Sequence, residues 1–544
     1  MRDRSCGLLT PVCLFSVIAC GDDPVATTDT NAASTTSETT TAETAAPTTT
    51  AEPPTTSDTP TTASTGEVVE PPAIARGIRL TRVTATQGVQ TEIVRDGLEL
   101  PPEDYTVPLI SRRKTVLRAD WSLHADFVPR ELLARLTVYT PEGETHVDEY
   151  KALVEGPSND GDFARTFRWQ LPADLVRPGM EYRIETFEAD PDAASGEVSD
   201  PPPILPLAGR GTLVVEDNPM VIKVELIPVK HVFDGMTCMP TITDDDLLAM
   251  KNWLEQHNAV ERADVTVAEP MEYTESIGKS EEGFVPVLTA LGILRAKLDP
   301  PANVYWYGLL QSCDAYPFGL LGQAYGIPDA PTRGLGFQRI ATGRYFGSGA
   351  EARDTFVHEV GHSQGRYHIR CSGGEAGTDA DYPHPNGRIG VWGYGIHDTQ
   401  LRSPTGFRDY MSYCNNSFVS DYGWDLTYDF IKELSSWDMA GAPADDAPLL
   451  VGTLHSDGRA TWWTTRGSAP QRGRGPDTRV EFAIAGATIT LPASVGEIPD
   501  SSAQVVAAPL PARWAEVDAL RLVVAGQLRH ASPRAAVREL HAAP

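Results

Sequence analysis

The sequence predicts a multidomain protein in which a mixed α/β domain lies between an N-terminal β-sandwich and a small β-rich C-terminal module. A chain of 544 residues is too long for one hydrophobic core. Short strands that alternate apolar and polar residues fill residues 73–218, and strands then alternate with helices over 219–440. The alternation typical of strands returns over 447–544, which completes the predicted architecture.

The first 20 residues have the features of an export signal. Two arginines precede an apolar run over residues 8–19 that is too short to span a bilayer. The segment VIAC at 17–20 resembles the lipobox of bacterial lipoproteins, which implies that Cys20 is lipidated and becomes the first residue after cleavage. An ordinary cleaved signal with an unmodified Cys20 is the alternative.

Residues 21–72 form a Thr/Pro-rich segment without aromatic residues, Lys or Arg. Such a composition cannot bury enough apolar surface to offset chain entropy, so we expect a disordered linker. As a flexible coil it would span roughly 40 Å. We therefore expect an extracytoplasmic lipoprotein, anchored at the outer membrane or the cell surface, whose folded domains stand clear of the bilayer.

The charge of the chain limits its partners. A formal net charge of −29 argues against nucleic acid as a partner. A composition that is 41% apolar can support packed cores. We expect a monomer that meets the membrane only through its N-terminal lipid.

The segment 73–218 reads as short strands separated by Pro, Gly and Asp clusters. Alternation is clearest at 136–138, 167–169 and 182–184, which favours an immunoglobulin-like β-sandwich. It could serve as a spacer or docking module, or as a pro-region that shields an active site. We favour a spacer, because the chain between Cys20 and Cys238 has no cysteine that could act as a zinc switch.

The domain over 219–440 shows alternating strands and helices. Residues 221–228 and 304–310 are apolar strands. Thr243 and three following aspartates form an N-cap and acidic first turn of one helix, and apolar residues over 284–291 indicate a second.

The strongest sequence signal is the set His358, Glu359, His362, Gly365 and His368. Histidines at i and i+4 share one helical face, so both can bind one metal ion while the adjacent glutamate addresses a water. A glycine can then turn the chain and return the third histidine as a ligand. The two-histidine motif alone arises by chance in about 7% of such chains, and the added Gly and His lower this about 400-fold.

This extended motif resembles that of the metzincin metallopeptidases, and residues 409–413 resemble their Met-turn. The resemblance implies a metzincin-like α/β fold for 219–440 and one catalytic Zn²⁺ held by the three histidines. It also implies that Glu359 acts as general base and that Met411 forms an apolar floor. Tyr413 would stabilise the oxyanion, with a packed core aromatic as its alternative role. Two features depart from better-known branches: Ile369 follows the third histidine, and a long Gly/Tyr/Pro-rich stretch precedes Met411.

The function implied is a secreted, lipid-anchored zinc endopeptidase that hydrolyses extracellular proteins or glycoproteins. The glycoprotein class comes from a similarity of the segments 392–394 and 421–426 to secreted bacterial metzincin-like proteins. The alternative is a catalytically silent adhesin or glycoprotein-binding lipoprotein. The substrate would lie along an exposed edge strand, for which we select Gly322, Gln323, Ala324 and Tyr325. Acidic residues over 375–381 could hold calcium, although no pattern there identifies such a site.

Cysteine usage agrees with export. Four cysteines fall in the α/β domain, which permits three pairings in an oxidising compartment. The resemblance places Cys371 after the third zinc ligand and Cys414 beside the Met-turn, so we favour this pair and, with it, Cys238–Cys313. A structural zinc held by cysteines is disfavoured because no CxxC spacing occurs.

The C-terminal module over 447–544 contains paired tryptophans, Trp462 and Trp463. Tryptophans bury large areas whenever they can, so we expect a core role ahead of a sugar-binding platform.

Overall fold

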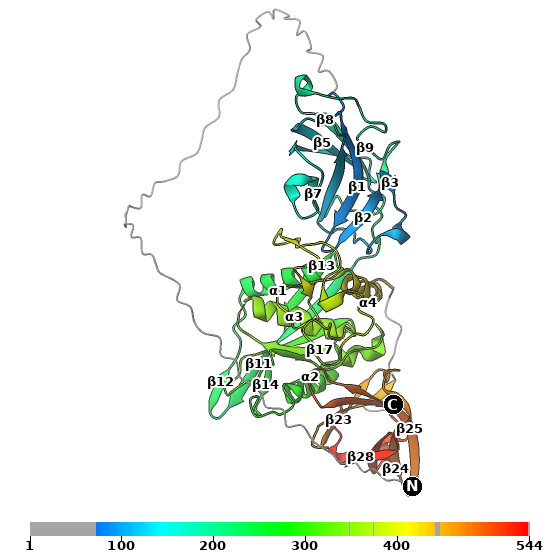
Figure 1. Ribbon diagram of the computed structural model, residues 1–544. Helices are drawn as coiled ribbons and strands as arrows, with labels where there is room; N and C mark the ends of the chain where they lie inside the picture. The colour runs from blue at the N-terminus through cyan, green and yellow to red at the C-terminus, as the bar shows by residue number, and fades with distance from the viewer. Residues whose placement is uncertain (1–71, 348, 374, 441–446, 542–544) are drawn as a thin grey trace, which may run out of the picture. The chain divides into compact units, whose positions relative to one another are not determined.

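The computed structural model describes residues 72–541 apart from 348, 374 and 441–446. The predicted signal segment with Cys20 and the predicted linker up to residue 71 lie outside the described residues. Within the described part, no helix combines the length and the apolar character that a membrane crossing requires. The chain is rich in strands and forms several sheets with few helices, as expected of a β-rich multidomain protein (Figure 1).

Two antiparallel sheets form the N-terminal part, in the orders β3-β2-β1-β4-β7 and β10-β8-β5-β6, with β9 on β8. Their strands are β1 (Ile78–Thr86), β2 (Gln90–Arg95), β3 (Leu98–Glu99), β4 (Thr115–Leu123), β5 (Arg130–Tyr139), β6 (Thr145–Val154), β7 (Phe167–Leu171), β8 (Glu181–Glu188), β9 (Ile204–Leu205) and β10 (Gly211–Thr212). Alternate residues of β1 and β5 share one core, so the two sheets pack face to face, while the immunoglobulin-like type stays a prediction. The three predicted strands lie within β5, β7 and β8.

A mixed sheet forms the centre of the chain, in the order β12-β11-β15-β17-β16. Its strands are β11 (Val221–Phe233), β12 (Met236–Cys238), β13 (Arg262–Val267), β14 (Met271–Tyr273), β15 (Val304–Leu310), β16 (Gly322–Ala324) and β17 (Ile340–Arg344). β13 and β14 also pair with β11. β11, β15 and β17 run parallel, and β16 is antiparallel at the edge. The strands predicted at 221–228 and 304–310 are confirmed.

Helices cover both faces of this sheet: α1 (Asp244–His257), α2 (Val285–Leu298), α3 (Ala350–Ser363) and α4 (Asp421–Ala440). Tyr305, Tyr307 and Leu309 of β15 share a core with α1, α3 and α4. The alternate residues Trp306 and Leu310 share a second core with α2 and the C-terminal strands. Figure 1 shows α1 and α3 on one side of β17 and α2 on the other. Because successive side chains of a strand point to opposite faces of the sheet, β15 contributes to both cores.

The start of α1 follows from its predicted N-cap. The Thr243 side chain accepts a hydrogen bond from the Asp246 N–H, and the Asp246 carboxylate accepts one from the Thr243 N–H. This capping box satisfies donors that a helix start leaves unpaired.

Short elements connect the larger ones. They are the two-stranded pairs β18 (Gly393–Tyr394) with β19 (Leu401–Arg402) and β20 (Arg408–Asp409) with β21 (Ser417–Phe418). The 3-10 helices are η1 (Pro102–Asp104), η2 (Phe163–Arg165), η3 (Pro191–Ala193), η4 (Arg333–Gln338), η5 (Pro385–Gly387), η6 (Trp514–Glu516) and η7 (Arg534–Ala536).

A seven-stranded antiparallel sheet forms the C-terminal module, in the order β23-β22-β26-β25-β24-β27-β28. The strands are β22 (Pro448–Leu454), β23 (Ala460–Arg466), β24 (Arg474–Ile484), β25 (Ala487–Glu497), β26 (Gln504–Pro509), β27 (Ala519–Val524) and β28 (Gln527–Pro533). Trp462 and Trp463 are each 1% exposed, which confirms their core role. Trp463 belongs to the core shared with α2, whereas Trp462 packs within the module.

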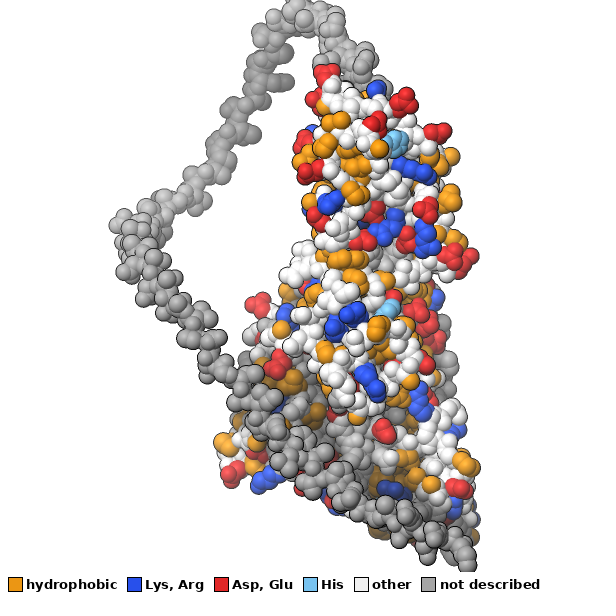
Figure 2. Space-filling model, in the orientation of Figure 1, with side chains coloured by type: hydrophobic (Ala, Val, Ile, Leu, Met, Phe, Trp, Pro, Cys, Tyr) orange, Lys and Arg blue, Asp and Glu red, His pale blue; other side chains and the backbone are white. Residues whose placement is uncertain are grey.

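On the face drawn in Figure 2, acidic and basic side chains are interspersed and neither sign forms a continuous area.

Candidate metal centre

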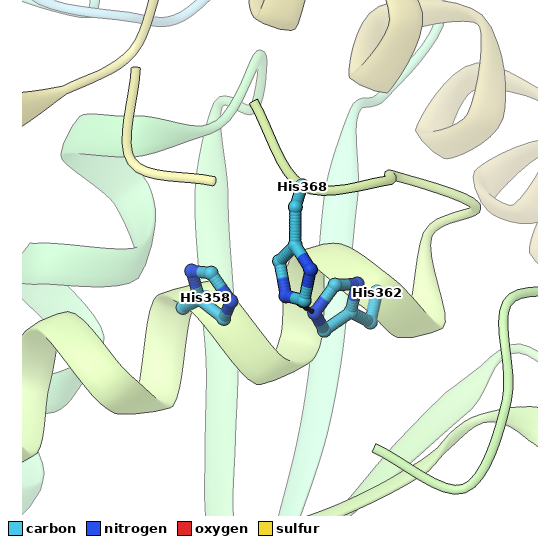
Figure 3. Close-up of side chains that lie close together, drawn as sticks. All are labelled: His358, His362 and His368. Carbon is cyan, nitrogen blue, oxygen red and sulfur yellow. Dashed lines mark hydrogen bonds between the residues drawn. The ribbon is translucent and has the colours of Figure 1, made fainter. Parts of the chain in front are cut away.

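Three histidine side chains meet beside one face of α3 (Figure 3). His358 and His362 stand one helical turn apart on α3, and His368 comes from the segment that follows the helix. One ring nitrogen from each lies within 4.8 Å of the others. The residues are 8%, 0% and 3% exposed, respectively. The spacing of the sequence motif thus places three imidazoles around one buried point.

Gly365 makes the return of His368 possible. It follows the end of α3 with a φ of 83°, in the left-handed region that glycine adopts without strain. A Cβ at this position would lie 2.8 Å from the carbonyl oxygen of Pro328. Both conformation and space therefore require glycine at the turn.

Backbone carbonyls fix the protonation of all three rings. The Nδ1 atoms of His358, His362 and His368 lie 2.9, 2.8 and 2.8 Å from the carbonyl oxygens of Tyr410, Arg366 and Ala376. A carbonyl only accepts, so each Nδ1 carries the proton and each Nε2 presents a lone pair. Burial lowers the pKa of His358 to about 4, with the neighbouring His368 adding to the effect. Burial also lowers the pKa of His362, so both histidines of α3 favour the neutral form that binds a metal.

The Nε2 atoms have the arrangement that a cation requires. Those of His362 and His368 lie 3.0 Å apart, although neither carries a proton when Nδ1 does. Among the described residues, His358 Nε2 has no hydrogen-bond partner. Three buried lone pairs that face one another are costly unless a cation binds them. The donor set fits a divalent transition metal, and zinc is among those that imidazole nitrogens bind.

Glu359 follows His358 on α3, and one of its carboxylate oxygens is free to act on a bound molecule. It is buried, and within the described part of the chain its Oε2 has no partner. Burial, and then the nearby Asp500 carboxylate, raise the pKa of Glu359. A carboxyl whose pKa is raised toward neutrality is suited to accept and return a proton.

The strand selected from sequence as a substrate edge lies against this glutamate. Gly322, Gln323 and Ala324 form β16 at the edge of the central sheet, but they and Tyr325 are all buried, so the predicted exposure is wrong. The Gln323 side chain is hydrogen-bonded to Phe284 and Pro499, which cover the strand. A Cβ on Gly322 would lie 2.6 Å from Cγ of Glu359. The edge strand and the carboxylate are thus in direct contact.

Met411 packs against α3 at Gly361. It is fully buried, and a Cβ on Gly361 would lie 2.5 Å from its sulfur. The Ile369 N–H donates to the Met411 carbonyl at 2.9 Å. The third histidine's segment is therefore tied to the methionine segment.

A buried ion pair that sequence reasoning missed stabilises the same region. Arg366 Nη2 and Asp409 Oδ1 lie 3.6 Å apart and both side chains are buried. Arg366 also supplies the carbonyl that His362 contacts, and Asp409 Oδ1 accepts the Met411 N–H. Both residues stand inside the quoted motifs, but only the fold shows that they pair.

Both favoured disulfides are present. Cys371–Cys414 and Cys238–Cys313 have Cα–Cα distances of 6.2 and 5.3 Å. A carboxylate oxygen of Glu375 and the sulfurs of Cys371 and Cys414 lie close enough together to hold a metal ion. The two sulfurs, however, are bonded to each other in the disulfide.

The Glu375 carboxylate is also engaged. Its Oε1 accepts the N–H groups of Cys371 and Ser372, and its Oε2 accepts that of Gly373. Calcium over 375–381 stays a prediction without structural support.

Tyr413 points its hydroxyl at the triad although the residue is 51% exposed. The oxygen lies 3.0 Å from His368 Nε2 and donates to Asp500 Oδ1 at 2.5 Å. Tyr413 is therefore not a packed core aromatic. Asp500 was missed from the sequence, because it lies in the C-terminal module and belongs to no motif.

Two cavities flank the triad. One of about 540 Å³ includes His362, His368 and Tyr367, and one of about 1050 Å³ includes His358, Glu359 and Gly322. Asp500 lines both. None of the described residues that line them comes from the N-terminal sandwich.

Comparisons with known proteins name no family. No protein-family model matches the chain, and no curated protein matches it. A solved structure titled "Structure of a chaperone-substrate complex" matches 50% of this chain at 11% identity with a TM-score of 0.22. The match covers 39% of that chain.

Proposed function

We propose that this chain is a zinc-dependent endopeptidase of the metzincin type. The observation that carries the proposal is the convergence of three Nε2 lone pairs beside the buried, unpartnered Oε2 of Glu359. The three histidines would hold the metal and Glu359 would serve the reaction. The buried Met411 and the inward-pointing hydroxyl of Tyr413 support the same assignment.

The residues divide the chemistry among them. A zinc ion at such a site acts as a Lewis acid that acidifies water and polarises a peptide carbonyl. Glu359 takes the proton of the attacking water at Oε2 and delivers it to the leaving amine nitrogen. The Tyr413 hydroxyl can donate to the developing oxyanion once it is released from Asp500.

The larger cavity and the edge strand β16 together suit an extended protein substrate. β16 offers an edge strand next to Glu359, and a peptide can pair with such an edge through main-chain hydrogen bonds. The larger cavity extends from β16 past His358 to Tyr413. We propose extracellular proteins or glycoproteins as substrates, with the chain held at a membrane through lipidated Cys20.

A second candidate is a catalytically silent adhesin or glycoprotein-binding lipoprotein. The observation that favours it is Asp500, whose carboxylate stands at the triad and accepts a hydrogen bond from the Tyr413 hydroxyl. Both candidates share the metal site and differ in turnover.

The test compares wild type with Glu359→Gln, using Glu131→Gln as a control because Glu131 is an exposed residue of the sandwich. Zinc content and chelator-reversible cleavage of casein and mucins are measured. We expect one zinc per chain in all three proteins and a loss of cleavage of about 10²–10⁴-fold in Glu359→Gln alone. A wild type without zinc, or a Glu359→Gln protein as active as wild type, would contradict the proposal.

A further inference from the structure

A carboxylate from the C-terminal module reaches the three histidines. We propose that Asp500 is a fourth protein ligand of the metal. While its carboxylate is bound to the metal, it keeps the peptidase latent. The inference rests on the proposed function, because it needs a metal at the triad. It adds to that function a residue from a different part of the chain and a way in which that residue restrains cleavage.

The position of Asp500 is that of a ligand. Its Oδ2 lies 3.7 Å from His368 Nε2, and its side chain is 20% exposed. Oδ1 accepts the Tyr413 hydroxyl, which itself lies 3.0 Å from the same nitrogen. Three neutral imidazoles leave a divalent cation uncompensated, so a carboxylate at this distance gains strongly from approaching it.

The turn that carries Asp500 is firmly held. Residues 498–503 connect β25 and β26, and Asp500 has a φ of 56° at its tip. Ile498 and Ala503 on either side are buried in the core shared with α2. The side-chain Nε2 of Gln323 donates to the backbone carbonyl of Pro499 at 2.8 Å, which joins the turn to the edge strand β16. Packing of two parts of the chain thus directs the carboxylate to the metal site.

Three consequences of this position oppose hydrolysis. A bound carboxylate takes the coordination position that a water needs in a catalytic zinc site. The hydroxyl proton of Tyr413 is committed to Asp500 and cannot serve an oxyanion. Asp500 also lines both cavities, so it stands where a substrate must cross from one to the other. Rotation about the side-chain bonds of Asp500 relieves all three while the buried residues of the turn stay in place.

The first measurement is metal affinity in the purified full chain. Asp500→Asn keeps the shape of the side chain and an oxygen that accepts from Tyr413, but removes the charge. Asp518→Asn is the control, since Asp518 is exposed in the same module and lines neither cavity. We expect Asp500→Asn to weaken Zn²⁺ affinity at least about 10-fold and to change the visible spectrum of the Co²⁺-substituted protein. An unchanged affinity and spectrum would overturn the assignment as ligand.

The second measurement is peptide cleavage. We expect Asp500→Asn to cleave casein faster than wild type, and the double variant Asp500→Asn/Glu359→Gln to lose that activity. Lower activity in Asp500→Asn with zinc still bound would overturn latency. Asp500→Ala serves as a second variant, and thermal unfolding reports whether either protein is damaged. Absence of zinc from wild type would instead refute the metallopeptidase itself, so the two failures are distinguishable.

Discussion

At the residue scale, the geometry of the histidine triad depends on the ring nitrogens that face away from its centre. Each histidine is oriented by a carbonyl that its Nδ1 contacts, and two of these carbonyls belong to Arg366 and Tyr410. Arg366 is in turn paired with buried Asp409. Because second contacts of this kind set the tautomer and direction of a ligand, they matter to affinity nearly as much as the ligands do.

Glu375 makes the stability of the fold around residues 371–375 depend on pH. Burial opposes its ionisation, but backbone N–H groups of Ser372, Cys371 and Gly373 overcome this and lower its pKa to about 2, from an ordinary value of 4.5. A carboxyl with a depressed folded-state pKa stabilises the fold above its ordinary pKa. This contribution is therefore lost as pH falls from about 4.5 toward 2.

We expect Glu375→Gln to lower the free energy of unfolding at pH 7 by about 2 kcal/mol, the usual worth of hydrogen bonds to a charged group. The difference from wild type should shrink as pH falls from 4.5 toward 2. Denaturant titrations across this range measure it. Glu269→Gln, at an exposed loop position, is the control and should show neither effect. A difference that stays constant with pH would contradict the role of the ionised carboxylate.

At the element scale, α3 does not complete the site. It supplies two histidines and Glu359, whereas the third histidine and Tyr413 come from separate segments. The Ile369–Met411 hydrogen bond and the Cys371–Cys414 disulfide join these two segments. The geometry of the site therefore depends on links between elements.

The two disulfides should be separable by their effect on metal binding. Their sequence separations are 43 and 75, so the chain-entropy argument assigns about 4 kcal/mol of stability to each. We expect the double variants Cys371→Ala/Cys414→Ala and Cys238→Ala/Cys313→Ala to lose similar stability in denaturant titrations. Only the first should weaken zinc affinity, because only it joins the segments of His368 and Tyr413. Equal zinc affinities would refute this division of roles.

At the scale of the whole molecule, the flanking parts have different relations to the site. The sandwich contacts the central domain through fully buried Arg113, which donates to the carbonyls of Val260 and Glu255. Its described residues line neither of the two cavities beside the triad. The C-terminal module instead shares a core with α2 and supplies Asp500.

We expect the central domain and the C-terminal module to unfold together. Trp463 lies in their shared core, and its ring contacts the position of Gly292 in α2. Trp463→Ala should cost about 3–5 kcal/mol, as for other buried aromatics. Trp463→Phe, which retains much of the ring, should cost less. Calorimetry that resolves a separate transition for the module in wild type would contradict the shared core.

The sequence by itself determined the local part of this protein. Periodicity located three of the sandwich strands, β5, β7 and β8, together with β11, β15, α1 and α2, because such patterns depend on neighbours a few residues apart. The motif over 358–368 placed three histidines and Glu359 together for the same reason. Four cysteines left three pairings, of which the resemblance favoured the one observed.

Only the tertiary structure decided the long-range part. The pairing of Arg366 with Asp409 and the approach of Asp500 to His368 join residues far apart in the chain. Contacts of this kind produce no periodic pattern in the sequence, since they arise where elements far apart in the chain pack against one another. The position of Asp500 beside the three histidines thus depends on how the shared core places the turn of the C-terminal module.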